Sequence, residues 1–417
     1  MTEDGSDRED NSGKAAPRRV RRRRVIYAHG FDPASVDRYR RLILRGGADR
    51  PGVEVSAERS GAISDLSEGW RMTAQRAGGE VETVFEILRY EDVVRHWRNR
   101  PAPQRLFTGL TSWARFAFLG GLRRTVMLAK GPAGLFFYPV TMLAIFALTG
   151  MALLGLCGAA LEHWLGAPDW ASQAGRGFGV LLGVWFSLRA ERALFIHLML
   201  ALFDFLIRSA EDRPPAGRLE TRIDAFADRI VESARDAQRA KVDEILIVGH
   251  SLGGLVAVRA LAGALERDVD LTGGRAAISL LTLGSVAGYV ACRGGPGAEA
   301  YEASVIRLAT ETDLHWVDIS APRDWFSFGL VDPLLMTEAP PPDARSPRVL
   351  SAKFGKFQPD PDDKRTRFRA MGLHMRYLGA PDREGGFDFF ECISGEKTLE
   401  DRFAQRRNSP KAKMLGW

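Results

Sequence analysis

A single serine near the middle of the chain has the sequence surroundings of a reactive nucleophile. Residues 249–253 read Gly-His-Ser-Leu-Gly, with Ser251 at the centre. Such a pentapeptide presents a serine hydroxyl when it joins a strand to a helix, because its two glycines permit a sharp, strained turn. An apolar run, ILIV, precedes it, and a helical pattern over residues 252–265 follows. These neighbours predict that Ser251 is a nucleophile and that Gly249 and Gly253 form its turn.

The segment GHSLGG resembles the α/β-hydrolase superfamily, and most of all its lipases and esterases, including class 3-like lipases. The resemblance covers residues 25–31 and 242–378. It implies an α/β fold, with a mostly parallel sheet covered by helices on both faces. It also implies a triad in the chain order serine, acid, histidine, which acts through an acyl-enzyme without a metal or organic cofactor.

The histidine of this triad can be sought among only seven in the chain. His374, in the segment GLHMRYL, is the one that follows the last strand expected to carry the acid. We therefore expect His374 to be the general base. His250 lies inside the pentapeptide, and we interpret it as a packing residue of the turn.

The acid is expected after the second strand that follows the nucleophile strand. Residues 314–319, LHWVDI, predict that strand, and the loop after it contains Asp324. We prefer Asp324 as the residue that orients His374. Asp332, farther along, remains the alternative, while Asp318 lies within the strand itself.

An oxyanion hole needs two backbone N–H groups aimed at the charge that develops on the substrate. Leu252, directly after the nucleophile, is expected to supply one of them. The second is expected from the early segment His29-Gly30-Phe31, which resembles the His-Gly oxyanion segment of the family and makes Phe31 the donor. An ordinary turn at the end of a strand is the alternative reading of His-Gly.

The elements that must position these residues follow from hydrophobic patterns. Apolar, β-rich runs at 25–31, 81–90 and 278–283 predict further strands. Residues 219–240 carry apolar side chains at steps of three and four, which predicts an amphipathic helix. Strands that alternate with helices indicate a parallel α/β sheet.

A long apolar segment interrupts this pattern. Residues 131–161 contain no charged side chain, which exceeds the roughly 20 residues that cross a bilayer. We expect residues 177–188 to return as a short or tilted span and residues 193–207 to lie at the membrane interface. Gly179 and Gly183 form a G-x-x-x-G pair that hints at helix contact.

Basic residues flank this hairpin on one side and predict its orientation. They are Arg123, Arg124, Lys130, Arg189 and Arg192. By the positive-inside rule, both ends of the hairpin face the cytoplasm. A buried helical pair in a soluble domain, acting as a lid or a dimer interface, is the alternative.

Composition bounds the remaining possibilities. The chain has 417 residues, of which 45% are hydrophobic, and this excludes disorder along its whole length. Its net charge of +6 does not demand a nucleic-acid-binding surface. The three cysteines are far apart in sequence and suggest neither a disulfide framework nor a zinc site.

The expected organisation has five parts. A disordered basic tail over residues 1–24 ends in an arginine run that could contact anionic lipids, although a solvated tail is the simpler reading. The hydrolase domain is split into residues 25–130 and 208–395, the hydrophobic insertion fills 131–207, and residues 396–417 form a loose basic tail.

Together these features predict a membrane-associated serine hydrolase of the esterase or lipase kind, facing the cytoplasm and cleaving carboxylic esters, lipid esters among them. The expected partners are the ester substrate, membrane lipids and, through the hairpin, a second copy of the chain. The alternative is a non-catalytic membrane scaffold that retains the hydrolase fold.

Overall fold

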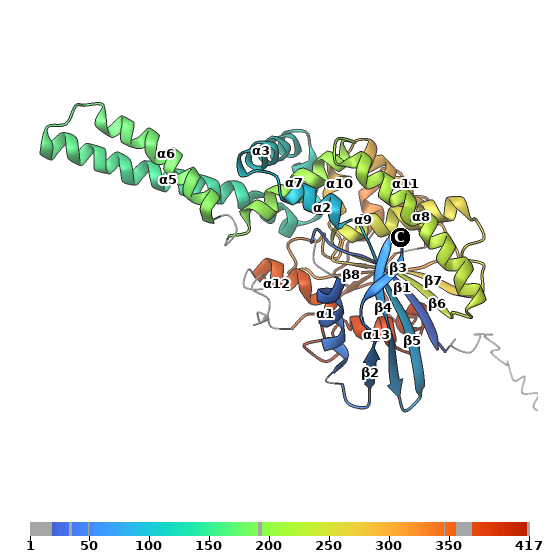
Figure 1. Cartoon of the computed structure of the whole chain (residues 1–417). Coiled ribbons are helices and arrows are strands. Elements are labelled where there is room, and N and C mark those ends of the chain that lie inside the picture. The colour runs from blue at the N-terminus through green and yellow to red at the C-terminus, as the bar shows by residue number, and fades with distance from the viewer. Residues whose placement is uncertain are drawn as a thin grey trace, which may run out of the picture.

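A nine-stranded sheet forms the centre of the molecule (Figure 1). The computed structural model describes residues 19–32, 36–48, 50–190, 194–345, 347–355 and 369–414. Its strands are β1 (Arg22–Ala28), β2 (Glu54–Ala57), β3 (Gly61–Ser64), β4 (Ser67–Arg76), β5 (Gly79–Leu88), β6 (Glu244–His250), β7 (Ala277–Leu283), β8 (His315–Ser320) and β9 (Arg348–Ser351).

The strand order is β2-β4-β5-β1-β6-β7-β8-β9, with β3 paired to β4 outside this path. The six strands from β5 to β9 in this order run parallel to one another. The strands β2, β3 and β4 add an antiparallel edge. The prediction of an α/β fold with a mostly parallel sheet is therefore confirmed.

Helices cover both faces of this sheet. They are α1 (Val36–Ala48), α2 (Glu91–Arg98), α3 (Ala102–Phe118), α4 (Gly121–Leu128), α5 (Lys130–Leu165), α6 (Ala171–Ala190), α7 (Ile196–Ala210), α8 (Ala216–Arg239), α9 (Leu252–Arg267), α10 (Gly288–Arg293), α11 (Pro296–Ala309), α12 (Arg369–Met375), α13 (Phe389–Ser394) and α14 (Leu399–Phe403). Two 3-10 helices are η1 (Pro333–Met336) and η3 (Arg376–Leu378).

Alternate residues of the central strands belong to two separate cores, as the two-residue period of a strand requires. Ile26 and Ile247 pack with α7, α8, α9 and α11 on one face. Val25 and Leu246 pack with α1, α13 and η3 on the other. Because the central strands are buried on both faces, they read in the sequence as continuous apolar runs.

The helices α5 and α6 form a long hairpin that projects from this body (Figure 1). The 36 residues of α5 correspond to about 54 Å of helix. Among the described helices, α5 is the one that is long and apolar enough to cross a membrane, with 11% of its most apolar window buried. The expected return span, residues 177–188, lies inside the continuous helix α6, which does not itself meet that test.

Three expectations about chain organisation were wrong. Residues 193–207 were expected at a membrane interface, but from Ile196 onward α7 is buried against the body of the protein. The arginine run was expected in a disordered tail, but Arg22–Arg24 begin the central strand β1. The C-terminal residues were expected to be loose, but Leu399 and Phe403 are buried in the core. Residues 1–18 lie outside the described residues.

Buried pairing explains why arginines occur in a central strand. The side chains of Arg23 and Glu244 are fully buried and lie 2.7 Å apart, with Arg23 Nε donating to Glu244 Oε2. Arg23 also donates to the carbonyl oxygens of Gly395 and Lys397. A buried guanidinium is tolerated when its donors are satisfied in this way, so the run belongs to the fold.

Candidate active site

The turn around Ser251 has the strained geometry that exposes a nucleophile. Strand β6 ends at His250 and helix α9 begins at Leu252, which leaves Ser251 alone at the junction, with φ 59° and ψ −119°. A side chain at positive φ costs of order 1–3 kcal/mol, and such strain clusters at functional sites. The amide of Ser251 donates to the Leu283 carbonyl at 2.9 Å, which fixes the turn to β7.

The two glycines of the turn are required by close backbone contacts. A Cβ atom at Gly249 would overlap the carbonyl of Gly253, and one at Gly253 would overlap the carbonyl oxygen of Ala28. The turn therefore packs directly on the end of β1. The same contact brings Gly30 beside the serine, because a Cβ atom at Gly30 would lie 3.4 Å from Ser251 Oγ.

Asp324 and His374 form a buried pair next to this turn. Asp324 lies in the loop after β8, and its Oδ2 is 2.9 Å from Nδ1 of His374, which lies in α12. If Nδ1 donates to the carboxylate, Nε2 carries no proton and is free to act as a base. His374 Nε2 is buried and has no hydrogen-bond partner among the described residues, the Ser251 hydroxyl included.

The Asp324 carboxylate is held as an anion by its neighbours. Burial alone would raise its pKa, but the adjacent His374 and hydrogen bonds from His374, Ser327 and Tyr377 bring the pKa below its usual value. The Phe326 amide donates to Asp324 Oδ1 at 3.0 Å. Asp324 is thus charged at neutral pH and fixed in orientation by several donors.

Contacts from His250 link His374 to the serine turn. Its Nε2 lies 2.9 Å from the carbonyl oxygen of His374, and the two rings are 5.1 Å apart between centroids. Burial lowers the pKa of His250 to about 3, so this ring is neutral. His250, which directly precedes Ser251, therefore connects the serine turn to the helix that carries His374.

The two expected oxyanion donors lie at the same turn. Leu252 is the first residue of α9, and Phe31 follows Gly30. Within the described part of the chain, neither of these amides donates a hydrogen bond to another backbone group. Donors left unpaired beside a nucleophile can bind an oxyanion.

His29, the other half of the His-Gly segment, has a packing role. Its ring stacks on Tyr90 with centroids 4.1 Å apart, and the Tyr90 hydroxyl donates to the His29 carbonyl. Burial lowers the pKa of His29. These contacts hold the chain after β1 against the residue that follows β5.

The alternative acids lie elsewhere. Asp332 accepts a hydrogen bond from the Leu334 amide at 2.9 Å and caps the N-terminus of η1. Asp318, in β8, accepts a hydrogen bond from Thr282 Oγ1 at 2.6 Å. Among the three candidates, the structure brings Asp324 to His374.

Two residues of this site were missed in the sequence. The Tyr377 hydroxyl donates to Asp324 Oδ2 at 3.0 Å and accepts a hydrogen bond from the Ala321 amide at 2.9 Å. The Phe326 ring stacks on His374 with centroids 4.7 Å apart. Tyr377 could have been suspected from the sequence, because it lies one helical turn after His374. Nothing in the local sequence indicates Phe326.

The described residues contain no group of three or more histidine, cysteine or acidic side chains that could hold a metal ion. Cys157, Cys292 and Cys392 are free thiols. Comparisons with protein-family models, curated proteins and solved structures find no significant match for this chain. What the site does must therefore be argued from its geometry.

Proposed function

We propose that this chain is a serine hydrolase of the α/β-hydrolase type that cleaves carboxylic esters. The observation that carries the proposal is the buried Asp324–His374 pair, whose free Nε2 lies on a helix linked to the strained Ser251 turn. A serine on a strained strand-to-helix turn and a histidine oriented by a buried carboxylate are features of serine hydrolases that act by nucleophilic catalysis.

The arrangement of strands supports the hydrolase assignment. Strand β6, which leads to Ser251, lies centrally in the parallel part of the sheet between β1 and β7. The acid follows β8, two strands along the sheet, and the histidine comes later in the chain. This is the order serine, acid, histidine that the resemblance implies.

In the proposed reaction, His374 Nε2 removes the proton from Ser251 Oγ, and the oxygen attacks the ester carbonyl carbon. The amides of Phe31 and Leu252 donate to the resulting oxyanion. His374 then gives the proton to the departing alcohol. A water molecule, activated by the same nitrogen, releases the acid from the acyl-enzyme.

We further propose that the α5–α6 hairpin anchors the enzyme in a membrane. Large apolar side chains are exposed along both helices, among them Leu148, Leu153, Leu156, Phe178, Leu181 and Phe186. Exposed apolar side chains that form a continuous surface mark contact with a membrane or another protein.

The contact between the two helices has the small residues typical of membrane helix pairs. Cβ atoms at Gly150 and Gly179 would each overlap backbone of the opposite helix, and one at Gly183 would overlap the Phe146 carbonyl. Such close backbone approach stabilises helix pairs in lipid, where apolar burial provides little driving force.

Aromatic side chains at the far end of the hairpin agree with this placement. Trp164 and Trp170 flank the turn between α5 and α6 and are 78% and 65% exposed. Tryptophan is enriched where a membrane meets water. An ester that resides in the bilayer, such as a lipid ester, is therefore the proposed substrate class.

Labelling of membranes with a fluorophosphonate probe tests the proposal. Wild-type protein should be labelled, and Ser251→Ala and His374→Ala should not, whereas Asp332→Asn serves as a variant of an acidic residue outside the pair. Absence of labelling in folded wild-type protein would refute the hydrolase and favour a scaffold. Recovery of intact protein in the soluble fraction without detergent would refute the anchor.

A further inference from the structure

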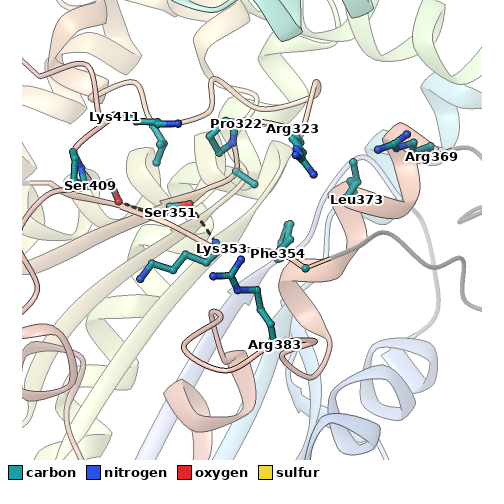
Figure 2. A pocket seen from close by; sticks show the side chains of 14 residues that line it. Pro322, Arg323, Ser351, Lys353, Phe354, Arg369, Leu373, Arg383, Ser409 and Lys411 are labelled. Carbon is teal, nitrogen blue, oxygen red and sulfur yellow. Dashed lines mark hydrogen bonds between the residues drawn. The ribbon is translucent and has the colours of Figure 1, made fainter.

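A cavity of about 500 Å³ is lined by residues that include Arg323 and Leu373, the sequence neighbours of Asp324 and His374 (Figure 2). Ser251, Asp324 and His374 do not line it. Its apolar lining residues include Pro322, Leu330, Phe354, Leu373 and Pro410. The cavity is therefore distinct from the proposed nucleophile site. Part of its lining comes from the loop that carries Asp324 and from the helix that carries His374.

Five cationic side chains line this cavity, and they come from five separate segments of the chain: Arg323, Lys353, Arg369, Arg383 and Lys411. No aspartate or glutamate is among the described residues that line it. Within the described part of the chain, none of the five side chains makes a hydrogen bond or an ion pair. The fold thus gathers like charges from distant positions, and these five side chains have no acidic partner among the residues that the structure describes.

The carboxylate of Asp382 lies beside Gly355 at the edge of the cavity, and it is already engaged. Asp382 forms an ion pair with Arg376 and accepts hydrogen bonds from the Gly355 amide. Elsewhere partly buried arginines form ion pairs with acids, as Arg50 does with Asp388 and Arg222 with Asp92. Asp382 is thus engaged by partners other than the five cations.

We propose that this cavity binds a phosphate ester, and that the ligand is an anionic phospholipid. Lysine and arginine bind phosphate through charge-assisted hydrogen bonds. The apolar wall formed by Leu373 and Phe354 would contact the glycerol and the first carbons of the acyl chains, which a small inorganic anion would leave uncovered.

The position of the cavity near the hairpin base favours a lipid as the source of the phosphate. Trp325, two residues after Arg323, packs on the start of α5, where a Cβ atom at Gly131 would lie 3.1 Å from Trp325 Cδ1. Lys413, two residues after Lys411, donates to the Leu128 carbonyl at 2.6 Å, just before α5. The identification of the ligand as a lipid rests on the proposed membrane anchor. The proposal that the cavity binds a phosphate group does not depend on that anchor.

Binding of short-chain lipids to the full chain in neutral detergent micelles tests the inference. The probes are dihexanoyl phosphatidic acid, dihexanoyl phosphatidylcholine and glycerol 3-phosphate, measured by isothermal titration calorimetry. Lys353→Ala/Arg383→Ala should weaken phosphatidic acid binding by at least about tenfold, because it removes two charge-assisted contacts. The control Arg218→Ala/Arg235→Ala removes two exposed cations of α8 and should bind as the wild type does.

Equal affinity of the cavity variant and the control variant would overturn the site. Glycerol 3-phosphate binding as tightly as phosphatidic acid would support the phosphate site and overturn the lipid source. Ser251→Ala should bind phosphatidic acid as the wild type does. Binding without fluorophosphonate labelling would refute the hydrolase alone, and labelling without binding would refute this site alone.

Discussion

His374 Nδ1 lies 2.9 Å from Asp324 Oδ2, while the opposite ring nitrogen is buried and unpaired among the described residues. A buried imidazole nitrogen without a partner is costly to maintain in a folded protein. The cost is understandable if Nε2 must remain available for a proton from Ser251. The stacked Phe326 ring and the Tyr377 hydroxyl hold the two partners in this orientation.

The first prediction separates the two candidate acids. Asp324→Asn should slow ester hydrolysis by up to about 10⁴-fold, because an amide cannot orient and stabilise the imidazolium as a carboxylate does. Asp332→Asn should remain within about threefold of the wild-type rate, since Asp332 caps the N-terminus of η1 and is not bound to His374. Hydrolysis of a p-nitrophenyl ester measures both, and equal losses would contradict the assignment.

The second prediction concerns the glycine that packs the nucleophile turn. Gly253→Ala should destabilise the protein by about 3 kcal/mol or more, because the added Cβ would overlap the Ala28 carbonyl and force β1 and α9 apart. Gly217→Ala in α8 is the matched control, since its Cβ would meet nothing within 4 Å. Chemical denaturation measures both, and an unaffected Gly253→Ala would show that the turn can relax.

The third prediction tests the hairpin contact with two glycines of one helix. Gly179→Leu should separate α6 from α5 and lower the unfolding temperature in detergent, because Gly179 touches the backbone of α5. Gly177→Leu should be tolerated, since a Cβ atom there meets nothing within 4 Å. Proteolysis within residues 166–170 should rise in the first variant only; a similar response of both variants would argue against the close contact.

The fourth prediction addresses the buried ion pair. Arg23→Ala should cost about 3–5 kcal/mol, because it leaves the Glu244 carboxylate buried and without its cation. Arg21→Ala, an exposed neighbour, should change stability by about 0.5 kcal/mol or less. The double variant Arg23→Met/Glu244→Leu should regain much of the loss, which urea denaturation would reveal. Equal stability of Arg23→Ala and Arg21→Ala would contradict the structure.

The fifth prediction is a pH dependence that originates in Asp318. Burial raises its pKa to about 7, well above the value of an aspartate in an unfolded chain. Between about pH 4 and 7 the folded state therefore holds a proton that the unfolded state releases, and stability falls as pH rises. Asp318→Asn, which has no such proton, should show a smaller fall between pH 5 and 8 by thermal unfolding. An identical slope in both proteins would refute this.

Local sequence was informative where a pattern is enforced by neighbours along the chain. The strand before Ser251 and the helix after it were readable, because their apolar periods and glycines act within a few residues of one another. The hairpin was equally readable as a long uncharged run, and α5 is indeed continuous over it. The arginines that begin β1 were misread, since a run of charge in sequence does not reveal that Arg23 has a buried partner 221 residues away.

By itself, the sequence determined the tight turn at Ser251, the class of the sheet and the apolar hairpin, because backbone sterics and hydrophobic periodicity are local properties. Only the tertiary structure decided which aspartate meets His374, that α7 is core and not membrane surface, and that five cations from separate segments surround one cavity. These relationships join residues far apart along the chain, and they exist only once the sheet has fixed which loops lie side by side.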